Sequence, residues 1–174
     1  MIIKTPKEEK LFREAAEISV EILEELGGMI REGVTPLEVD FQAGFLCKKY
    51  GVQAAFKRVD GYNFNCCISV NGVAVHGIPK DVPFKKGDLV SIDFGIIHKG
   101  IYTDHCWTWS VGEPSKEKKK LIEAGRKAVE NAVNKAVVGS RIGDLGFEMQ
   151  REAERNGFNT LSVFVGHGIG KTLH

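Results

Sequence analysis

Two stretches of the sequence, 33–51 and 139–157, follow the same pattern 106 residues apart. Each is bracketed by glycines and is preceded by a long segment with helical spacing of its apolar residues. Glu38-Val39 and Phe41-Gln42 in the first stretch match Asp144-Leu145 and Phe147-Glu148 in the second. The repeat indicates a fold made of two related halves. The alternative is that two ordinary amphipathic helices happen to align.

If the repeat is real, the segment that carries His76 and Asp93 should have a counterpart near positions 182 and 199, beyond the last residue, His174. We therefore expect residues 1–174 to form a single domain that is the N-terminal two-thirds of a larger one. A chain of 174 residues is long enough to bury a core of its own.

The predicted elements give an α/β (α+β) fold in which helices cover one face of an antiparallel sheet. Thr5-Pro6-Lys7-Glu8 and Thr35-Pro36-Leu37-Glu38 are both capping boxes that start a helix. Asn71-Gly72 is a strong hairpin signal between two short apolar runs. Further helices are predicted over about 115–138 and 142–156, and strands over 67–70, 73–75, 89–97, 101–109 and 160–165.

Composition excludes several classes of protein. Hydrophobic residues make up 43% of the chain, charged residues 27%, and the net charge is +1, so nothing favours a nucleic-acid or membrane partner. The four cysteines lack a C-x-x-C spacing, and residues 1–4 lack an apolar leader. We expect a reduced, cytoplasmic protein.

Asp93 and Asp104 are the first candidates for chemistry. A loop of His98-Lys99 would place them directly opposite each other on one face of a hairpin, with Cβ atoms roughly 5 Å apart. Two like charges so placed repel, and a divalent cation is the usual reason for such a pair. The alternatives are a bulge that turns one aspartate to solvent, or pairing of one aspartate with His105 or a lysine.

Three histidines could join this pair. His167 lies between two glycines after an apolar run, where the backbone can approach a ligand closely. His76 and His174 could reach the same pocket, although each could equally be a structural loop residue. A phosphate site at Gly170-Lys171-Thr172 is disfavoured, because Val165 occupies the position where a P-loop needs glycine.

The ordered motifs of the chain resemble those of the type I methionine aminopeptidases. The fold that this resemblance implies is the pseudo-two-fold "pita-bread" fold, a curved antiparallel sheet with helices on its outer face, whose second half is incomplete here. The matching stretches are 67–71, 75–79, 87–93, 100–104, 111–112 and 166–174.

The resemblance also implies a site. Asp93 and Asp104 would bridge two divalent metal ions (Co, Mn, Fe or Zn), and His167 would bind one of them. A metal-bound hydroxide would attack the peptide bond after the first methionine. His76 would contact the scissile amide, and His174 would stabilise the carbonyl oxygen or the tetrahedral intermediate.

The implied substrates are nascent polypeptides that begin with methionine, with the ribosome as a further candidate partner and no membrane or direct nucleic-acid recognition. Tyr62 and Cys67 match the family's methionine pocket, whereas Phe56, Val59 and Leu173 stand where cysteine, tyrosine and phenylalanine are more frequent.

Two glutamates from the family's second half complete its site, so the three ligands of this chain alone would bind metal weakly. The alternative function is that of a catalytically inactive short relative that serves as a nascent-chain or ribosome-binding module.

Overall fold

The computed structural model describes residues 2–174, so Met1, the first residue of the N-terminal segment considered above, lies outside it. Backbone contacts divide the chain into two compact units. One comprises the residues up to Glu113 together with His167–His174, and the other is Pro114–Gly166. The expectation of one domain over residues 1–174 remains a prediction.

The first unit begins with two helices, α1 (Pro6–Gly27) and α2 (Pro36–Lys49), which start where the capping signals predict. The Glu8 N–H donates to Thr5 Oγ1 at 3.2 Å. At α2 the box is reciprocal: the Glu38 N–H donates to Thr35 Oγ1 at 3.2 Å, and the Thr35 N–H donates to Glu38 Oε2 at 2.7 Å. A short 3₁₀ helix, η1 (Phe56–Arg58), follows α2.

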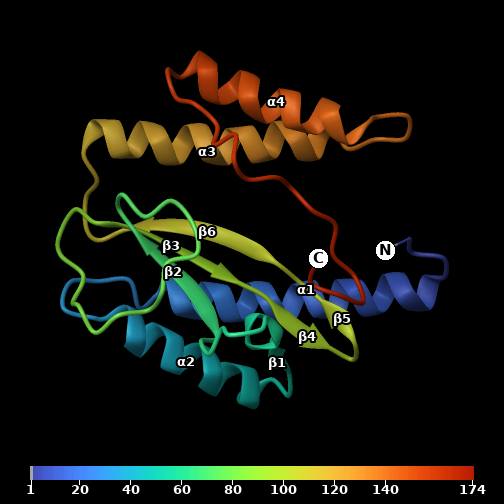
Figure 1. Cartoon of the computed structure of the whole chain (residues 1–174), viewed down its shortest axis with the longest axis horizontal. Coiled ribbons are helices and arrows are strands. Elements are labelled where there is room, and N and C mark those ends of the chain that lie inside the picture. Colours follow the sequence, from blue (N-terminus) through green and yellow to red (C-terminus); the bar gives the residue numbers. More distant parts are fainter. Residues whose placement is uncertain (1) are drawn as a thin grey trace. The chain divides into compact units, whose positions relative to one another are not determined.

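Six strands of this unit form two antiparallel sheets, drawn in Figure 1. The sheet orders are β1-β4-β5 and β2-β3-β6. The strands are β1 (Gln53–Ala54), β2 (Cys66–Val70), β3 (Leu89–Phe94), β4 (Ile96–His98), β5 (Ile101–Tyr102) and β6 (His105–Ser110).

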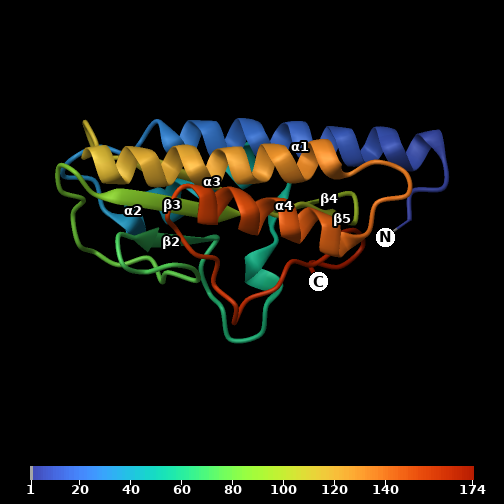
Figure 2. The same ribbon diagram turned by 90° about the horizontal axis from the view of Figure 1, so that it is seen from above.

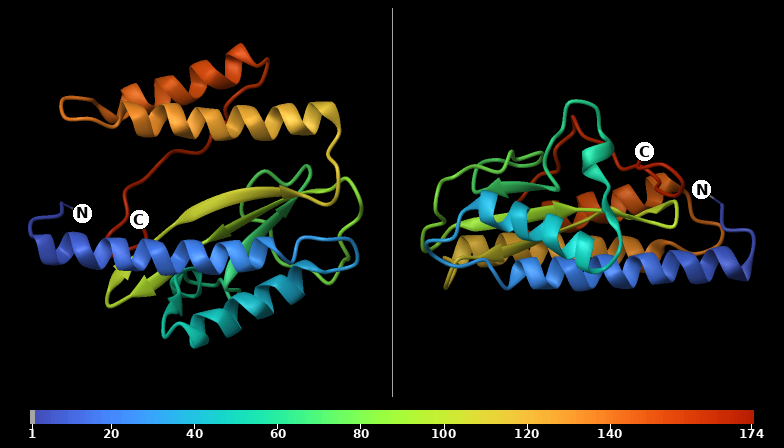
Figure 3. Two further views of the ribbon diagram at one scale, coloured as in Figure 1. Left: turned by 180° about the vertical axis from the view of Figure 1, so that it is seen from behind. Right: turned by 90° about the horizontal axis from the view of Figure 1, so that it is seen from below.

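The core lies between the sheets and the two helices. Side chains alternate along β3, so Val90, Ile92 and Phe94 join one buried cluster with the apolar faces of α1 and α2. Figure 3 shows α1 and α2 on the same side of the strands. Residues Ser91 and Asp93 therefore lie on the opposite face of β3.

The turn between β4 and β5 is Lys99-Gly100, one residue later than predicted. Ile97 pairs with Tyr102 and His98 with Ile101, which leaves two residues in the loop. Lys99 has φ 50° and Gly100 φ 82°, the two positive values that a type I′ turn requires. Each residue before the turn consequently pairs with a residue two positions later in the chain than predicted.

Two predicted strands are absent from the described structure. Only Asn71, at φ 52°, takes a positive φ in the Asn71-Gly72 pair, and β2 pairs with β3 instead of with residues 73–75. The Asn71 side chain binds the start of β3, since its Oδ1 accepts from the Leu89 N–H at 3.0 Å. Residues 160–165 are exposed and do not pair with any described strand.

The second unit is a pair of helices, α3 (Lys116–Lys135) and α4 (Ile142–Arg155), which lie side by side in Figures 1 and 2. Small side chains on α3 allow close packing, because Ala124, Ala128 and Ala132 are its buried residues. The buried Glu152 joins the two helices by accepting a hydrogen bond from Asn131 Nδ2 at 3.1 Å.

The sequence repeat is confirmed in the backbone. Helices α2 and α4 both have 14 residues, and both ends of α4 lie 106 positions after those of α2. The bracketing glycines also match: φ is 88° and 67° at Gly33 and Gly51, and 93° and 75° at Gly139 and Gly157. Even the bond that closes each helix is repeated, from Val52 N–H to Cys47 O and from Phe158 N–H to Ala153 O, each at 2.9 Å.

No helix among residues 2–174 is both long and apolar enough to cross a bilayer. The four cysteines are free thiols in the structure.

A buried carboxylate on α2 fixes the start of β2. Asp40 Oδ1 accepts from the backbone N–H groups of Asn65 at 2.7 Å and Cys66 at 3.1 Å, and Asp40 Oδ2 accepts from Asn65 Nδ2 at 3.1 Å. The Tyr62 hydroxyl donates to the Cys66 carbonyl at 2.9 Å. The Cys66 residue is therefore held from both sides, which sets the position of Cys67.

We predict that Asp40→Ala lowers the free energy of unfolding by about 3 kcal/mol, because two buried backbone N–H groups lose their acceptor. Urea unfolding followed by circular dichroism measures the change. Asp60→Ala removes an exposed carboxylate and is the matched control. Equal stability of the two variants would show that the Asp40 bonds do not hold β2.

Candidate metal centre

The candidate centre begins on the face of the sheet that points away from the helices. Asp93 is the central residue of a row across three strands, with Cys67 of β2 on one side and Cys106 of β6 on the other. The prediction that Asp104 lies directly opposite Asp93 is wrong, because the one-residue shift of the turn puts Cys106 there. Asp104 is instead the diagonal neighbour, and the two aspartates still share one face.

Asp104 lies in a gap between β5 and β6, opposite the gap that Gly95 makes between β3 and β4. The Thr103 N–H donates to the Ile96 carbonyl at 2.9 Å, so the two segments stay together. Gly95 is required here: a Cβ atom on it would stand 2.1 Å from the Thr103 carbonyl oxygen. This close approach brings Asp104 next to Asp93.

The two carboxyl groups of Asp93 and Asp104 are within hydrogen-bonding reach of each other. Burial, followed by the charge of Asp104, raises the pKa of Asp93 to about 7. Burial also raises the pKa of Asp104, while the imidazole of His167 opposes the rise. Two partly buried carboxyl groups thus share a site in which the charge of one disfavours ionisation of the other.

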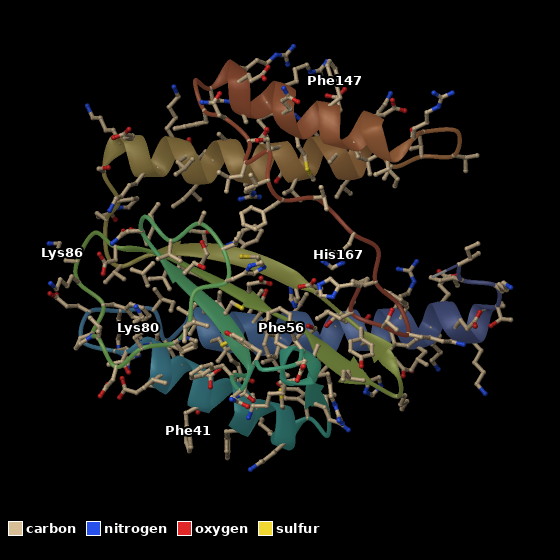
Figure 4. All side chains as sticks on the ribbon, in the orientation of Figure 1. Phe41, Phe56, Lys80, Lys86, Phe147 and His167 are labelled. Carbon is tan, nitrogen blue, oxygen red and sulfur yellow. The ribbon has the colours of Figure 1, made fainter. Side chains whose placement is uncertain are left out.

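His167 reaches this pair, as predicted. Its Nε2 atom is 3.3 Å from Asp104 Oδ2, and its Nδ1 atom is 3.2 Å from the Gly168 carbonyl oxygen. The His174 ring lies beside it, with ring centroids 4.5 Å apart. Figure 4 shows the His167 side chain between the C-terminal segment and the sheet.

His105 does not pair with Asp93 or Asp104, which was one of the alternatives considered from the sequence. His105 follows Asp104 directly, so its side chain points to the other face of β6, where Nε2 is 2.7 Å from the buried Ser19 Oγ on α1. Desolvation by burial lowers the pKa of His105.

The donor atoms suit a divalent metal ion. Two carboxylates and one imidazole are the ligands that Mn²⁺, Fe²⁺, Co²⁺ and Zn²⁺ share. Within residues 2–174, however, no three His, Cys, Asp or Glu side chains are already arranged to enclose an ion. The structure presents two overlapping pairs, Asp93 with Asp104 and Asp104 with His167.

His76 lies on the loop that follows β2 and packs along that strand. The Ile68 N–H donates to the Gly77 carbonyl at 2.8 Å, and the Gly77 N–H donates to Ser69 Oγ at 3.1 Å. His76 itself has φ 56°, a left-handed conformation that is uncommon outside glycine. The loop thus lies along the edge of β2 that faces away from β3, and it carries His76 there.

A small apolar cluster borders the centre. Cys67, Phe56, Ala55 and Leu173 are buried together, with Tyr62, Ile97 and Tyr102 packed against them. A cleft of about 270 Å³ opens beside this cluster. Its lining includes Val59, Leu173 and His174. The pocket residues named from the sequence therefore lie together, and Phe56 is labelled in Figure 4.

Two supporting residues were not predicted from the sequence. Gly95 interrupts an otherwise alternating apolar strand, which is a recognised signal of close backbone approach. Ser19 falls on the apolar stripe of α1, four positions after Ala15, where a polar side chain needs a buried partner.

We predict that Gly95→Ala weakens Mn²⁺ binding at least about tenfold, because substitutions of residues that position metal ligands commonly lower metal affinity by this factor. The added methyl group would push the Thr103 carbonyl away and separate Asp104 from Asp93. Isothermal titration calorimetry measures the affinity. Gly125→Ala, in an open helical position, is the control and should leave the affinity unchanged. Unaltered binding by Gly95→Ala would contradict this account of the glycine.

Comparison with known proteins places these observations in a family. The model of metallopeptidase family M24 matches residues 10–174. The chain is 38% identical over 174 residues to the methionine aminopeptidase of Clostridium perfringens, covering 100% of this chain and 70% of that protein. It is 36% identical to methionine aminopeptidase 1 of Bacillus subtilis, with the same coverage.

Solved structures agree. The methionine aminopeptidase of Thermotoga maritima superposes with a TM-score of 0.94 at 38% identity, covering 100% of this chain and 70% of that one. Prolidase from Pyrococcus furiosus gives 0.86 at 26% identity, covering 99% of this chain and 50% of that one. The expected fold class is confirmed, with antiparallel sheets and helices in the arrangement of the aminopeptidases. The chain belongs to metallopeptidase family M24, and its resemblance to the methionine aminopeptidases is confirmed.

Proposed function

We propose that this protein removes the N-terminal methionine from nascent polypeptides by metal-dependent hydrolysis. The observation that carries the proposal is the partly buried pair Asp93 and Asp104 with His167 beside Asp104, in a chain that matches methionine aminopeptidases along its whole length. Two carboxylates brought together in this way repel each other, and a bound divalent metal ion would compensate that repulsion.

Asp93, Asp104 and His167 would hold the divalent metal ions. The two aspartates would offer carboxylate oxygens and His167 an imidazole nitrogen, on the face of β3 opposite the buried cluster of Val90, Ile92 and Phe94. When bound, such ions act as Lewis acids on the peptide carbonyl and lower the pKa of water at the site. Because the pKa of Asp93 is raised to about 7, metal binding would compete with protonation of this carboxyl group and would weaken as the pH falls below that value.

The two remaining histidines would handle the peptide. His174, whose ring lies beside that of His167 at a tilt of 56°, would donate a hydrogen bond to the carbonyl oxygen or to the tetrahedral intermediate. His76 would contact the scissile amide from the loop along β2. Its left-handed backbone is the kind of strained conformation that occurs at functional sites.

The methionine side chain would enter the apolar cluster. Tyr62 and Cys67 would form one wall, with Phe56 and Leu173 beside them. The thioether is unbranched and polarizable, and it makes favourable contacts with aromatic rings. The Tyr62 hydroxyl is occupied by the Cys66 carbonyl, so the ring presents its apolar body to the ligand.

The substrates would be nascent chains that begin with methionine, which places the reaction in the cytoplasm where translation occurs. The names of the relatives support this substrate class. The ribosome is a candidate partner on the same ground, because the substrates emerge from it.

We predict that Asp104→Ala lowers the rate of methionine release by more than about a hundredfold, since changes in the outer shell alone cost 10–100-fold. The assay uses protein expressed from its natural gene, a Met-Ala-Ser peptide and added Co²⁺, Mn²⁺ or Fe²⁺. Asp60→Ala, which alters an exposed aspartate, should retain full activity.

An active Asp104→Ala protein would refute the proposed metal ligands. A wild-type protein that releases no methionine with any of the three ions, yet binds ribosomes or nascent chains, would replace hydrolysis with a binding function.

We also predict that metal removal is reversible. Dialysis against a chelator should abolish peptide hydrolysis, and Mn²⁺ added at 100 times its dissociation constant should restore it and stabilise the fold by about 2.7 kcal/mol. Differential scanning calorimetry with and without Mn²⁺ measures the stabilisation. An equal shift in an Asp93→Ala, Asp104→Ala double variant would show that the ion binds elsewhere.

A further inference from the structure

Ser19 is a buried polar residue in the middle of α1. Only 1% of its surface is exposed, and the helix face that carries it packs against β3, β4 and β5. A hydroxyl placed so deeply costs free energy unless both its proton and its lone pairs find partners. Its partners therefore indicate what the residue does.

Both partners of Ser19 flank Asp104. The Thr103 hydroxyl donates to Ser19 Oγ at 2.8 Å, and Ser19 Oγ lies 2.7 Å from His105 Nε2. Because Ser19 accepts from Thr103, its own proton is available for the His105 nitrogen. Thr103 Oγ1 in turn accepts from the Ile96 N–H at 3.0 Å. One chain of hydrogen bonds thus runs from β4 through Thr103 and Ser19 to His105.

This chain of bonds acts where the sheet gives little support. Thr103 and Asp104 belong to neither β5 nor β6, and only the Thr103 N–H makes a ladder-type bond there. Side chains at 103 and 105 both reach toward α1, so the side chain between them faces the opposite side of the sheet. That is the side on which Asp93 and His167 lie.

We propose that Ser19 is a positioning residue for the carboxylate of Asp104: by binding Thr103 on one side and His105 on the other, it holds the backbone so that Asp104 points at Asp93 and His167. The inference rests on the proposed function, in which Asp104 is a metal ligand. Ser19 touches neither substrate nor metal, and it acts through the two residues that it binds.

The test compares metal binding by Ser19→Ala with binding by the wild-type protein, both expressed from the natural gene. We expect the affinity for Mn²⁺, measured by calorimetry, to fall about tenfold or more, the usual effect of removing support from a ligand. The visible absorption of the Co²⁺-loaded protein should change in position or intensity, because the geometry of Asp104 changes. A loss of fold stability alone would not alter that spectrum.

Ser91→Ala is the matched control. The Ser91 hydroxyl also forms a part-buried bond, 2.7 Å to Thr108 Oγ1 in the same sheet, but its partner does not adjoin Asp104. It should leave the Mn²⁺ affinity and the Co²⁺ spectrum as in the wild type. Unchanged affinity in Ser19→Ala, or an equal loss in both variants, would overturn the proposal.

Thr103 provides a second route if Ser19→Ala does not fold. Thr103→Val should weaken Mn²⁺ binding about tenfold, whereas Thr103→Ser keeps the hydroxyl and should bind like the wild type. Equal affinities in these two variants would also overturn the proposal. This test can fail without refuting the proposed function. If the wild-type protein binds Mn²⁺ and the Ser19→Ala and Thr103→Val variants bind it equally well, only the role of Ser19 is refuted.

Discussion

The alternation of side chains along β3 is the constraint on which the site depends. Val90, Ile92 and Phe94 are buried against α1 and α2, and this burial fixes which face Ser91 and Asp93 must take. A slip of one residue would move Asp93 into the apolar core, where an unpaired charge is very costly. The same hydrophobic packing that stabilises the first unit therefore also orients its principal acidic residue.

Two carboxyl groups placed together on that face work against stability. Burial and the charge of Asp104 raise the pKa of Asp93 to about 7. A cation bound beside the pair would favour the ionised form of both carboxyl groups. The close approach at Gly95 makes the arrangement possible, since any side chain there would collide with the Thr103 carbonyl.

Sequence patterns predicted the elements that depend on local chemistry. The capping residues Thr5 and Thr35 gave correct helix starts, and the 106-residue repeat reappears in the φ angles and closing bonds of α2 and α4. The hairpin predicted at Asn71-Gly72 does not form. The Asn71 side chain instead binds the start of β3, a tertiary contact that a local sequence pattern does not encode. Asp93, Asp104 and His167 were identified correctly as neighbours, but their diagonal relation follows from a turn that begins one residue later than expected.

Buried polar residues of the helices position the site where few backbone hydrogen bonds of the sheet do so. Asp40 of α2 binds the backbone at the start of β2, next to Cys67. Ser19 of α1 binds both neighbours of Asp104. In each case a helix that buries the core on one side of the sheet also fixes, through a single polar side chain, the segment that presents a functional residue on the other side. Loss of such a contact would loosen the site before it unfolded the core, because the apolar cluster between helix and sheet would remain.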